Sequence, residues 1–211
     1  MMSARILKAL KTAALGQASQ CRPSVEEGKD CAYLAIVILV AITPVRIAHA
    51  QVAEPAGYKM DGFRSQVPDG LAGAKTVTTR QAWQLWKAGG IPFIDVMPQA
   101  PKPKNLAEGA FWREKTRNNI PGSYWLANVG YGRLHPDVEN WFKNRLALLT
   151  SGNKDKPVLF YCLMDCWMSW NAAKRALDYG YSNVLWYPDG SDGWRFEGYP
   201  LKASYPEIYA N

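Results

Sequence analysis

Val158-Leu-Phe-Tyr-Cys-Leu-Met-Asp-Cys-Trp-Met-Ser169 joins an apolar run to two cysteines and then to a helix-forming segment. The first four residues predict a short buried strand, and the residues from Ser169 to Leu177 predict a helix that Gly180 ends. Cys162 and Cys166 therefore fall between the carboxyl end of a strand and the amino end of a helix. Ligands bind at that edge of open parallel sheets, and the free N–H groups of a helix start favour anions, thiolates included. This position predicts reactive cysteines.

The N-terminal region carries the pattern of a secretory leader. Residues 32–45 are apolar over the length of a signal-peptide core but are too short to span a bilayer, and Ala48-His49-Ala50 forms a small-x-small cleavage site. Pro44 and Arg46 argue against the alternative of a membrane anchor. We therefore expect residues 1–50 to be a signal peptide with a long N-terminal extension, cleaved after Ala50. The remaining chain is then expected to be periplasmic and not attached to the membrane.

Cleavage would leave Cys162 and Cys166 as the only cysteines. An exported compartment is oxidising, but a disulfide between residues so close in sequence removes little entropy from the unfolded chain, so its value would lie in reactivity. The net charge would fall from +7 to +4, because residues 1–50 hold six of the 25 Lys and Arg and three of the 18 Asp and Glu. We predict no nucleic-acid partner. The chain has no nucleotide-binding glycine loop or haem-attachment motif, and we predict no cofactor.

The chain from Gln51 onward has the size of one domain. Residues 51–73 predict an irregular arm, residues 74–203 the folded domain and residues 204–211 a C-terminal tail. Strands are expected at 75–77, 93–96, 124–129, 158–161 and 184–187. Helices are expected from the capping box at Thr78–Gln81 to Gly89, at 135–149 and at 169–177. This alternation predicts an α/β fold, a parallel sheet with helices on both faces.

Four motifs occur in the order and at the spacing of the rhodanese-like domain, which this chain resembles from about residue 74 to residue 201. They are Phe93-Ile-Asp-Val96, Asn119-Ile-Pro-Gly-Ser123, Phe160-Tyr-Cys162 and the glycine-rich run Asp189–Trp194. The resemblance implies a single rhodanese-like domain in which Cys162 is the nucleophile. Asn119 stands where the family has a histidine.

A narrower resemblance rests on the leader, the Cys-x-x-x-Cys-Trp run and Trp194. Together they look like the exported proteins named for PQQ-dependent catabolism and a CXXCW motif, although three residues, not two, separate the cysteines here. The resemblance implies a role accessory to PQQ-dependent alcohol oxidation. It also implies a partner among exported redox or quinoprotein-pathway proteins.

The cysteine loop departs from active sulfurtransferases of this fold, in which a short loop containing arginine follows the cysteine. Here Leu163 follows Cys162, and the loop contributes the carboxylate of Asp165 but no cation. A carboxylate repels anionic sulfur donors and opposes thiolate formation. We therefore expect no efficient thiosulfate:cyanide transfer, and we expect sulfurtransferase-like or thiol-redox chemistry instead.

Three interpretations of the thiol pair remain open. In the first, Cys162 is the nucleophile and Cys166 resolves it in a thiol–disulfide or persulfide cycle. In the second, the soft donors Cys162, Met164, Cys166 and Met168 bind and deliver Cu(I). In the third, the domain is a non-catalytic binding module. We favour the first, without a bound metal, and expect the active-site loop to comprise Leu163, Met164, Asp165, Trp167, Met168 and Ser169.

Overall fold

The computed structural model describes residues 52–99, 105, 107–108 and 115–207. The expected leader, its cleavage point after Ala50 and the last four residues of the expected tail lie outside these ranges. Over the ranges described, we find no helix that combines the length and the apolar character needed to cross a membrane.

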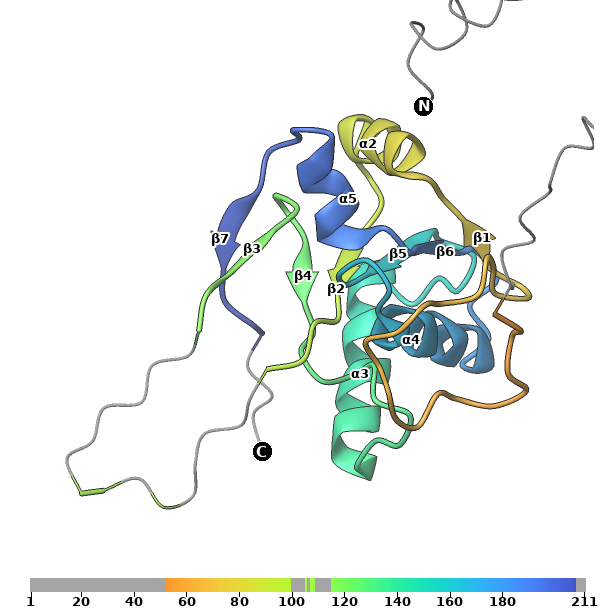
Figure 1. The fold of residues 1–211 in the computed structure, drawn as a ribbon. Coiled ribbons are helices and arrows are strands. Elements are labelled where there is room, and N and C mark those ends of the chain that lie inside the picture. The colour runs from red at the N-terminus through yellow and green to blue at the C-terminus, as the bar shows by residue number, and fades with distance from the viewer. Residues whose placement is uncertain (1–51, 100–104, 106, 109–114, 208–211) are drawn as a thin grey trace, which may run out of the picture. The chain divides into compact units, whose positions relative to one another are not determined.

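The core of the domain is a five-stranded parallel sheet in the order β1-β6-β5-β2-β4 (Figure 1). Strands β2 and β5 are central and buried, so that the residues following them meet at the same edge of the sheet. A separate antiparallel pair joins β3 to β7. The strands are β1 (Lys75–Thr76), β2 (Phe93–Asp95), β3 (Arg117–Asn119), β4 (Tyr124–Trp125), β5 (Val158–Tyr161), β6 (Val184–Tyr187) and β7 (Lys202–Ser204).

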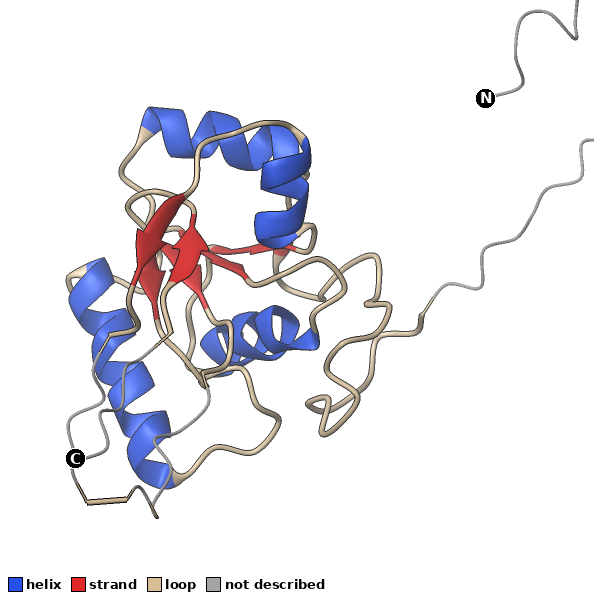
Figure 2. Ribbon diagram, turned by 60° about the vertical axis from the view of Figure 1, so that its left-hand side comes forward, coloured by secondary structure: helices blue, strands red, loops and turns tan. Residues whose placement is uncertain are grey.

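Helices cover both faces of the sheet (Figure 2). On one face, α3 (Pro136–Thr150) and α4 (Trp167–Asp178) bury residues such as Phe142 and Trp170 in a core that includes both cysteines. On the other face, α2 (Thr79–Ala88) and α5 (Gly190–Phe196) pack around Trp194. The α/β fold expected from the sequence is therefore confirmed.

Several expected elements differ in extent. The strand expected at 124–129 is limited to β4, and the helix expected from Ser169 begins two residues earlier, at Trp167. Helix α5 and the β3–β7 pair were not expected. Strand β7 extends one residue beyond the boundary expected at 203, and Glu207 N donates to Trp125 O at 2.9 Å, so residues 204–207 return to the domain.

Residues 52–73 form an irregular arm alongside α4, drawn in orange in Figure 1. Asn171 of α4 holds the arm by accepting from Lys59 N and donating to Lys59 O, each at 2.9 Å. Trp170 donates from its indole to Gly70 O at 3.2 Å, and the Tyr58 hydroxyl donates to Asp178. The arm is therefore attached to α4 along most of its length.

Candidate active site

Cys162 and Cys166 flank the turn from β5 to α4. Cys162 directly follows β5, and Cys166 is the N-cap residue of α4, with an extended backbone at φ −124° and ψ 105°. Asp165 lies in the left-handed region at φ 50°, which an aspartate tolerates better than most residues and which turns the chain sharply between the cysteines. Both cysteines are free thiols, and a hydrogen bond joins them.

The carbonyl of Cys162 is held from two other parts of the chain. It accepts from Ser191 N at 3.0 Å, from Ser191 Oγ at 3.3 Å and from Arg117 Nη2 at 3.1 Å. The start of α5 can approach this closely because residue 190 is glycine, with φ +53°. A Cβ at this position would lie 2.5 Å from the Cys162 carbonyl oxygen. These contacts fix the backbone from which the thiol projects.

Asp95, the last residue of β2, organises the same edge of the sheet. Its Oδ2 accepts from Arg117 Nε at 2.6 Å, and its Oδ1 accepts from Met97 N at 2.9 Å. Burial raises the pKa of the Asp95 carboxyl, and the charge and hydrogen bond of Arg117 oppose that rise. Arg117 thus supplies a cation beside Cys162, which the cysteine loop itself lacks, but a carboxylate already pairs with it.

The pKa values of the two thiols are shifted in opposite directions. Burial raises the pKa of Cys162 well above its ordinary value, and the hydrogen bond and charge of Cys166, followed by the charge of Asp95, raise it further. The pKa of Cys166 is lowered to about 7, first by the hydrogen bond from Cys162 and then by the backbone amides of Met168 and Leu163 and the charge of Arg64. These shifts favour the thiolate form at Cys166 over Cys162, and the sequence interpretation of Cys162 as the nucleophile stays a prediction. The largest cause is the hydrogen bond from Cys162, and a smaller one is the Met168 amide in the first turn of α4, which begins at Trp167.

The expected loop residues take different roles. The Leu163 amide faces both thiols, and Met164 N donates to Asp192 Oδ2 at 3.2 Å. Asp165 is exposed, and the carboxylate among the main causes of the raised Cys162 pKa is Asp95. Ser169 does not start the helix; it lies inside α4, where its hydroxyl donates to Cys166 O at 3.0 Å.

The thiols are closed off from solvent. Cys162 is 0% exposed and Cys166 is 2% exposed. The arm covers them, because Arg64 forms an isolated antiparallel bridge with Cys166 and Phe63 O accepts from Trp167 N at 2.9 Å. The indole of Trp167 also donates to Ser65 Oγ at 3.1 Å and Gln66 O at 3.2 Å. The sequence placed the thiols at a ligand-binding edge of the sheet and did not show that the arm covers them, so their burial was not expected.

Met97 gives the pair a third sulfur neighbour. The thiol of Cys162 contacts Met97 Sδ at 3.6 Å, whereas Met168, a donor suggested by the sequence, packs its carbonyl and Cβ against Gly130. Met97 is half-buried and lines a pocket of about 270 Å³. The other residues lining that pocket are Pro98, Gln99, Lys115, Thr116, Arg117 and Trp125.

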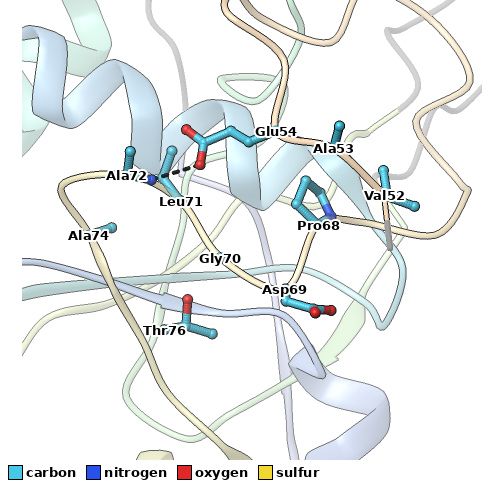
Figure 3. A pocket seen from close by; sticks show the side chains of 10 residues that line it. All are labelled: Val52, Ala53, Glu54, Pro68, Asp69, Gly70, Leu71, Ala72, Ala74 and Thr76. Atoms are coloured by element: carbon cyan, nitrogen blue, oxygen red, sulfur yellow. Dashed lines mark hydrogen bonds between the residues drawn. The ribbon is translucent and has the colours of Figure 1, made fainter. Parts of the chain in front are cut away.

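A second pocket, of about 500 Å³, lies within the folded arm and beside β1 (Figure 3). It contains no cysteine, and Glu54, which points across it in Figure 3, accepts from Ala72 N at 2.9 Å. This arrangement stabilises the arm and brings together no reactive groups, so we place the functional site at the thiol pair.

Sequence reasoning missed Met97, Arg117 and Arg64 as neighbours of the thiols. Met97 lies two residues after Asp95, and Arg117 lies two residues before Asn119, so each was adjacent to a motif that had been recognised. Their convergence depends on the β2–β5 pairing and on β3, an element that the polar sequence before Asn119 did not predict.

Comparison with known proteins yields a family and several similar structures. The family described as "Rhodanese-like domain" matches residues 78–197. No curated protein matches the chain.

Three solved structures illustrate the structural similarity. The polysulfide-sulfur transferase homodimer of Wolinella succinogenes is 20% identical, with 62% of this chain and 80% of that chain covered and a TM-score of 0.38. An uncharacterized protein of Saccharomyces cerevisiae is 20% identical, with coverages of 59% and 92% and a TM-score of 0.38. A protein of unknown function from Rhodopseudomonas palustris, described as a possible tyrosine phosphatase, is 23% identical, with coverages of 61% and 85% and a TM-score of 0.40.

Proposed function

Because this chain belongs to the rhodanese-like domain family, we propose that Cys162 and Cys166 perform thiol–disulfide or persulfide exchange, with Cys166 as the attacking thiolate. The observation that carries the proposal is the contact between the two thiols at the start of α4, where the pKa of Cys166 is lowered to about 7. A thiol with a pKa near the ambient pH combines a useful thiolate fraction with good nucleophilicity.

In the disulfide form of the cycle, the Cys166 thiolate attacks a disulfide of an exported protein. One S–S bond forms, one breaks, and the partner leaves as a thiolate. Cys162 then loses its proton and attacks Cys166 Sγ, which releases the second partner thiol. The pair is oxidised by two electrons and the partner disulfide is reduced by two.

In the persulfide form, the Cys166 thiolate attacks the outer sulfur of a donor R–S–SH. The donor leaves as RS⁻, and Cys166 carries the sulfane sulfur as a persulfide. A second acceptor thiolate can take that sulfur. Attack by Cys162 on Cys166 Sγ would instead release HS⁻ and leave a disulfide.

Either reaction requires the arm to open, since Phe63 and Arg64 cover the pair. A partner protein that displaces these residues would gain access to Cys166 before Cys162, because Cys166 lies directly beneath Arg64. The closed arm would then protect the reduced pair from unspecific oxidation between reactions.

We also propose that the protein is exported and acts beside a quinoprotein pathway. The support is the leader pattern with its cleavage site after Ala50 and the Cys-x-x-x-Cys-Trp run. Intact mass measured on protein from the host periplasm should correspond to a chain that begins at Gln51. A chain that retains residues 1–50 in the cytoplasm would contradict the export proposal.

The test of the thiol chemistry uses the full chain with Cys21→Ser and Cys31→Ser, so that only the pair contributes. The protein is first equilibrated with glutathione disulfide. Thiol titration should then find no free thiol before mild reductant is added and two free thiols afterwards. Exposure to a low-molecular-weight persulfide should add one sulfur atom to Cys166 in the Cys162→Ser variant. If the pair stays reduced under both treatments and reacts no faster than free glutathione, the proposed function is wrong.

A further inference from the structure

Met97, from a distant part of the chain, brings a thioether sulfur to the Cys162 thiol. The Cys162 thiol contacts Met97 Sδ at 3.6 Å and is hydrogen-bonded to Cys166. A metal bound in a plane by three sulfurs at about 2.3 Å separates them by about 4 Å. The observed Cys162–Met97 contact is close to that separation, so a small metal ion fits between these atoms with little movement.

The backbone holds Met97 at this position from both sides. Its amide donates to Asp95 Oδ1 at 2.9 Å, and its carbonyl accepts from the Trp125 indole at 2.8 Å. The thioether is therefore presented to Cys162 by the same carboxylate that pairs with Arg117.

The charges around the pair favour a monovalent ion. Asp95 and Arg117 form an ion pair and together add no net charge. Arg64 contributes one positive charge beside Cys166, which a single thiolate balances. If Cys162 also lost its proton, the site would carry one net negative charge, and an unbalanced buried charge is costly. A bound ion of charge +1 would balance it.

The pocket of about 270 Å³ borders Met97, although neither cysteine lines it. Met97 lines the pocket on one side and contacts Cys162 on the other, and Pro98 and Trp125 form apolar walls. Among the described residues there is no cluster of three or more His, Cys, Asp or Glu that could hold a harder metal. Two thiolates and a thioether are soft donors, which select Cu(I) among biological metals.

We propose that the reduced Cys162–Cys166 pair and Met97 bind one Cu(I), with Met97 replacing the Met164 and Met168 ligands that the sequence had suggested. Binding releases the thiol protons and changes no oxidation state. The disulfide form of the pair lacks the thiolates and does not bind the ion. This inference uses the same reduced pair as the proposed exchange reaction, but it does not depend on that reaction.

The test titrates the reduced full chain, with Cys21→Ser and Cys31→Ser, with Cu(I) under anaerobic conditions against a bicinchoninate competitor. We expect one Cu(I) per chain and a thiolate-to-copper absorption band in the ultraviolet. Cys162→Ser and Cys166→Ser should abolish both. Met97→Leu, which preserves volume and removes the sulfur, should weaken binding about tenfold or more, while the exposed thioether control Met60→Leu should not change it.

Two results would overturn the proposal: no retention of Cu(I) against the competitor, or equal affinity in Met97→Leu and Met60→Leu. Near-ultraviolet circular dichroism of each variant shows whether the fold is retained, and Met97→Gln offers a second non-thioether substitution if Leu disturbs packing. The thiol titration of the parent protein separates the two proposals. A pair that forms its disulfide but binds no copper contradicts only the metal site, and a pair that binds copper but never exchanges contradicts only the proposed function.

Discussion

The guanidinium of Arg117 lies against the backbone carbonyl of Cys162, with Nη2 3.1 Å from the oxygen, although the two residues are 45 positions apart. The same side chain reaches Asp95 through Nε at 2.6 Å and Ser191 through Nη2 at 2.9 Å. One arginine thus connects the ends of β2 and β5 with the start of α5. The site is held by this network, and not by the cysteine loop alone.

Removing Arg117 should destabilise the domain strongly. Arg117→Gln leaves the Asp95 carboxylate buried without its cation, and loss of one partner of a buried ion pair costs about 3–5 kcal/mol. The Arg117 side chain is only 13% exposed and Asp95 is fully buried, so solvent screens the pair little. Urea unfolding measures the change, and Asp95→Asn combined with Arg117→Gln should recover part of the loss. A change below about 1 kcal/mol in the single variant would show that the pair is solvated.

Alkylation of the pair should depend on pH in a way that identifies the thiolate. Because the pKa of Cys166 is lowered to about 7 and that of Cys162 is raised, the Cys166 thiolate should form as pH rises through about 7 while Cys162 stays protonated. Iodoacetamide labelling followed by peptide mass spectrometry should show this order. Arg64→Gln should move the Cys166 midpoint to higher pH, since a positive charge near the thiolate is lost. Preferential labelling of Cys162 at neutral pH would contradict the assignment.

Loosening the arm should expose the thiols. Asn171→Ala removes two hydrogen bonds to Lys59 and one to Gly130 O, which should cost about 2–3 kcal/mol. Labelling of Cys166 should accelerate about tenfold or more without global unfolding. Thr150→Val serves as the control, because it removes a buried hydrogen bond within α3 and leaves the arm attached. Equal acceleration in both variants would mean that labelling follows global unfolding and not arm opening.

Gly190 should tolerate no side chain. Gly190→Ala places a Cβ 2.5 Å from Cys162 O in addition to forcing alanine to φ +53°. Gly198→Ala imposes a similar backbone strain at φ +71°, with no atom within 4 Å of the added Cβ. We expect about 1–2 kcal/mol of destabilisation at Gly198 and about 1–3 kcal/mol more at Gly190 from the clash. Thermal or urea unfolding compares the two, and equal losses would show that α5 can shift away from Cys162.

Much of the fold could be predicted from local patterns. The strands at 158–161 and 184–187 coincide with β5 and β6, because four-residue apolar runs with valine and aromatic residues, bounded by turn residues, are typical of buried strands. The capping box of Thr78 and Gln81 is present as expected, with Gln81 N donating to Thr78 Oγ1 at 3.3 Å. Helix α5 was missed because its sequence includes Gly190 and Gly193, which favour turns unless tertiary packing requires them.

The site could be predicted only in part. Two cysteines separated by three residues in a β-to-α junction are visible in the sequence, and the structure brings their thiols together. The neighbours that set their chemistry are not local: Met97 follows another strand, Arg117 belongs to β3, and Arg64 belongs to the arm. The burial of the pair could not be predicted for the same reason: it results from contacts between residues far apart in the sequence, which a local hydrophobic pattern does not reveal.

The most direct measurement traps the first covalent intermediate. Each single variant, Cys162→Ser and Cys166→Ser, in the background lacking Cys21 and Cys31, is mixed at pH 7 with a small aromatic disulfide, and the adducts are mapped by peptide mass spectrometry. We expect a stable mixed disulfide to form faster on Cys166 when Cys162 is replaced than on Cys162 when Cys166 is replaced. A fast adduct on Cys162 and a slow one on Cys166 would contradict this expectation.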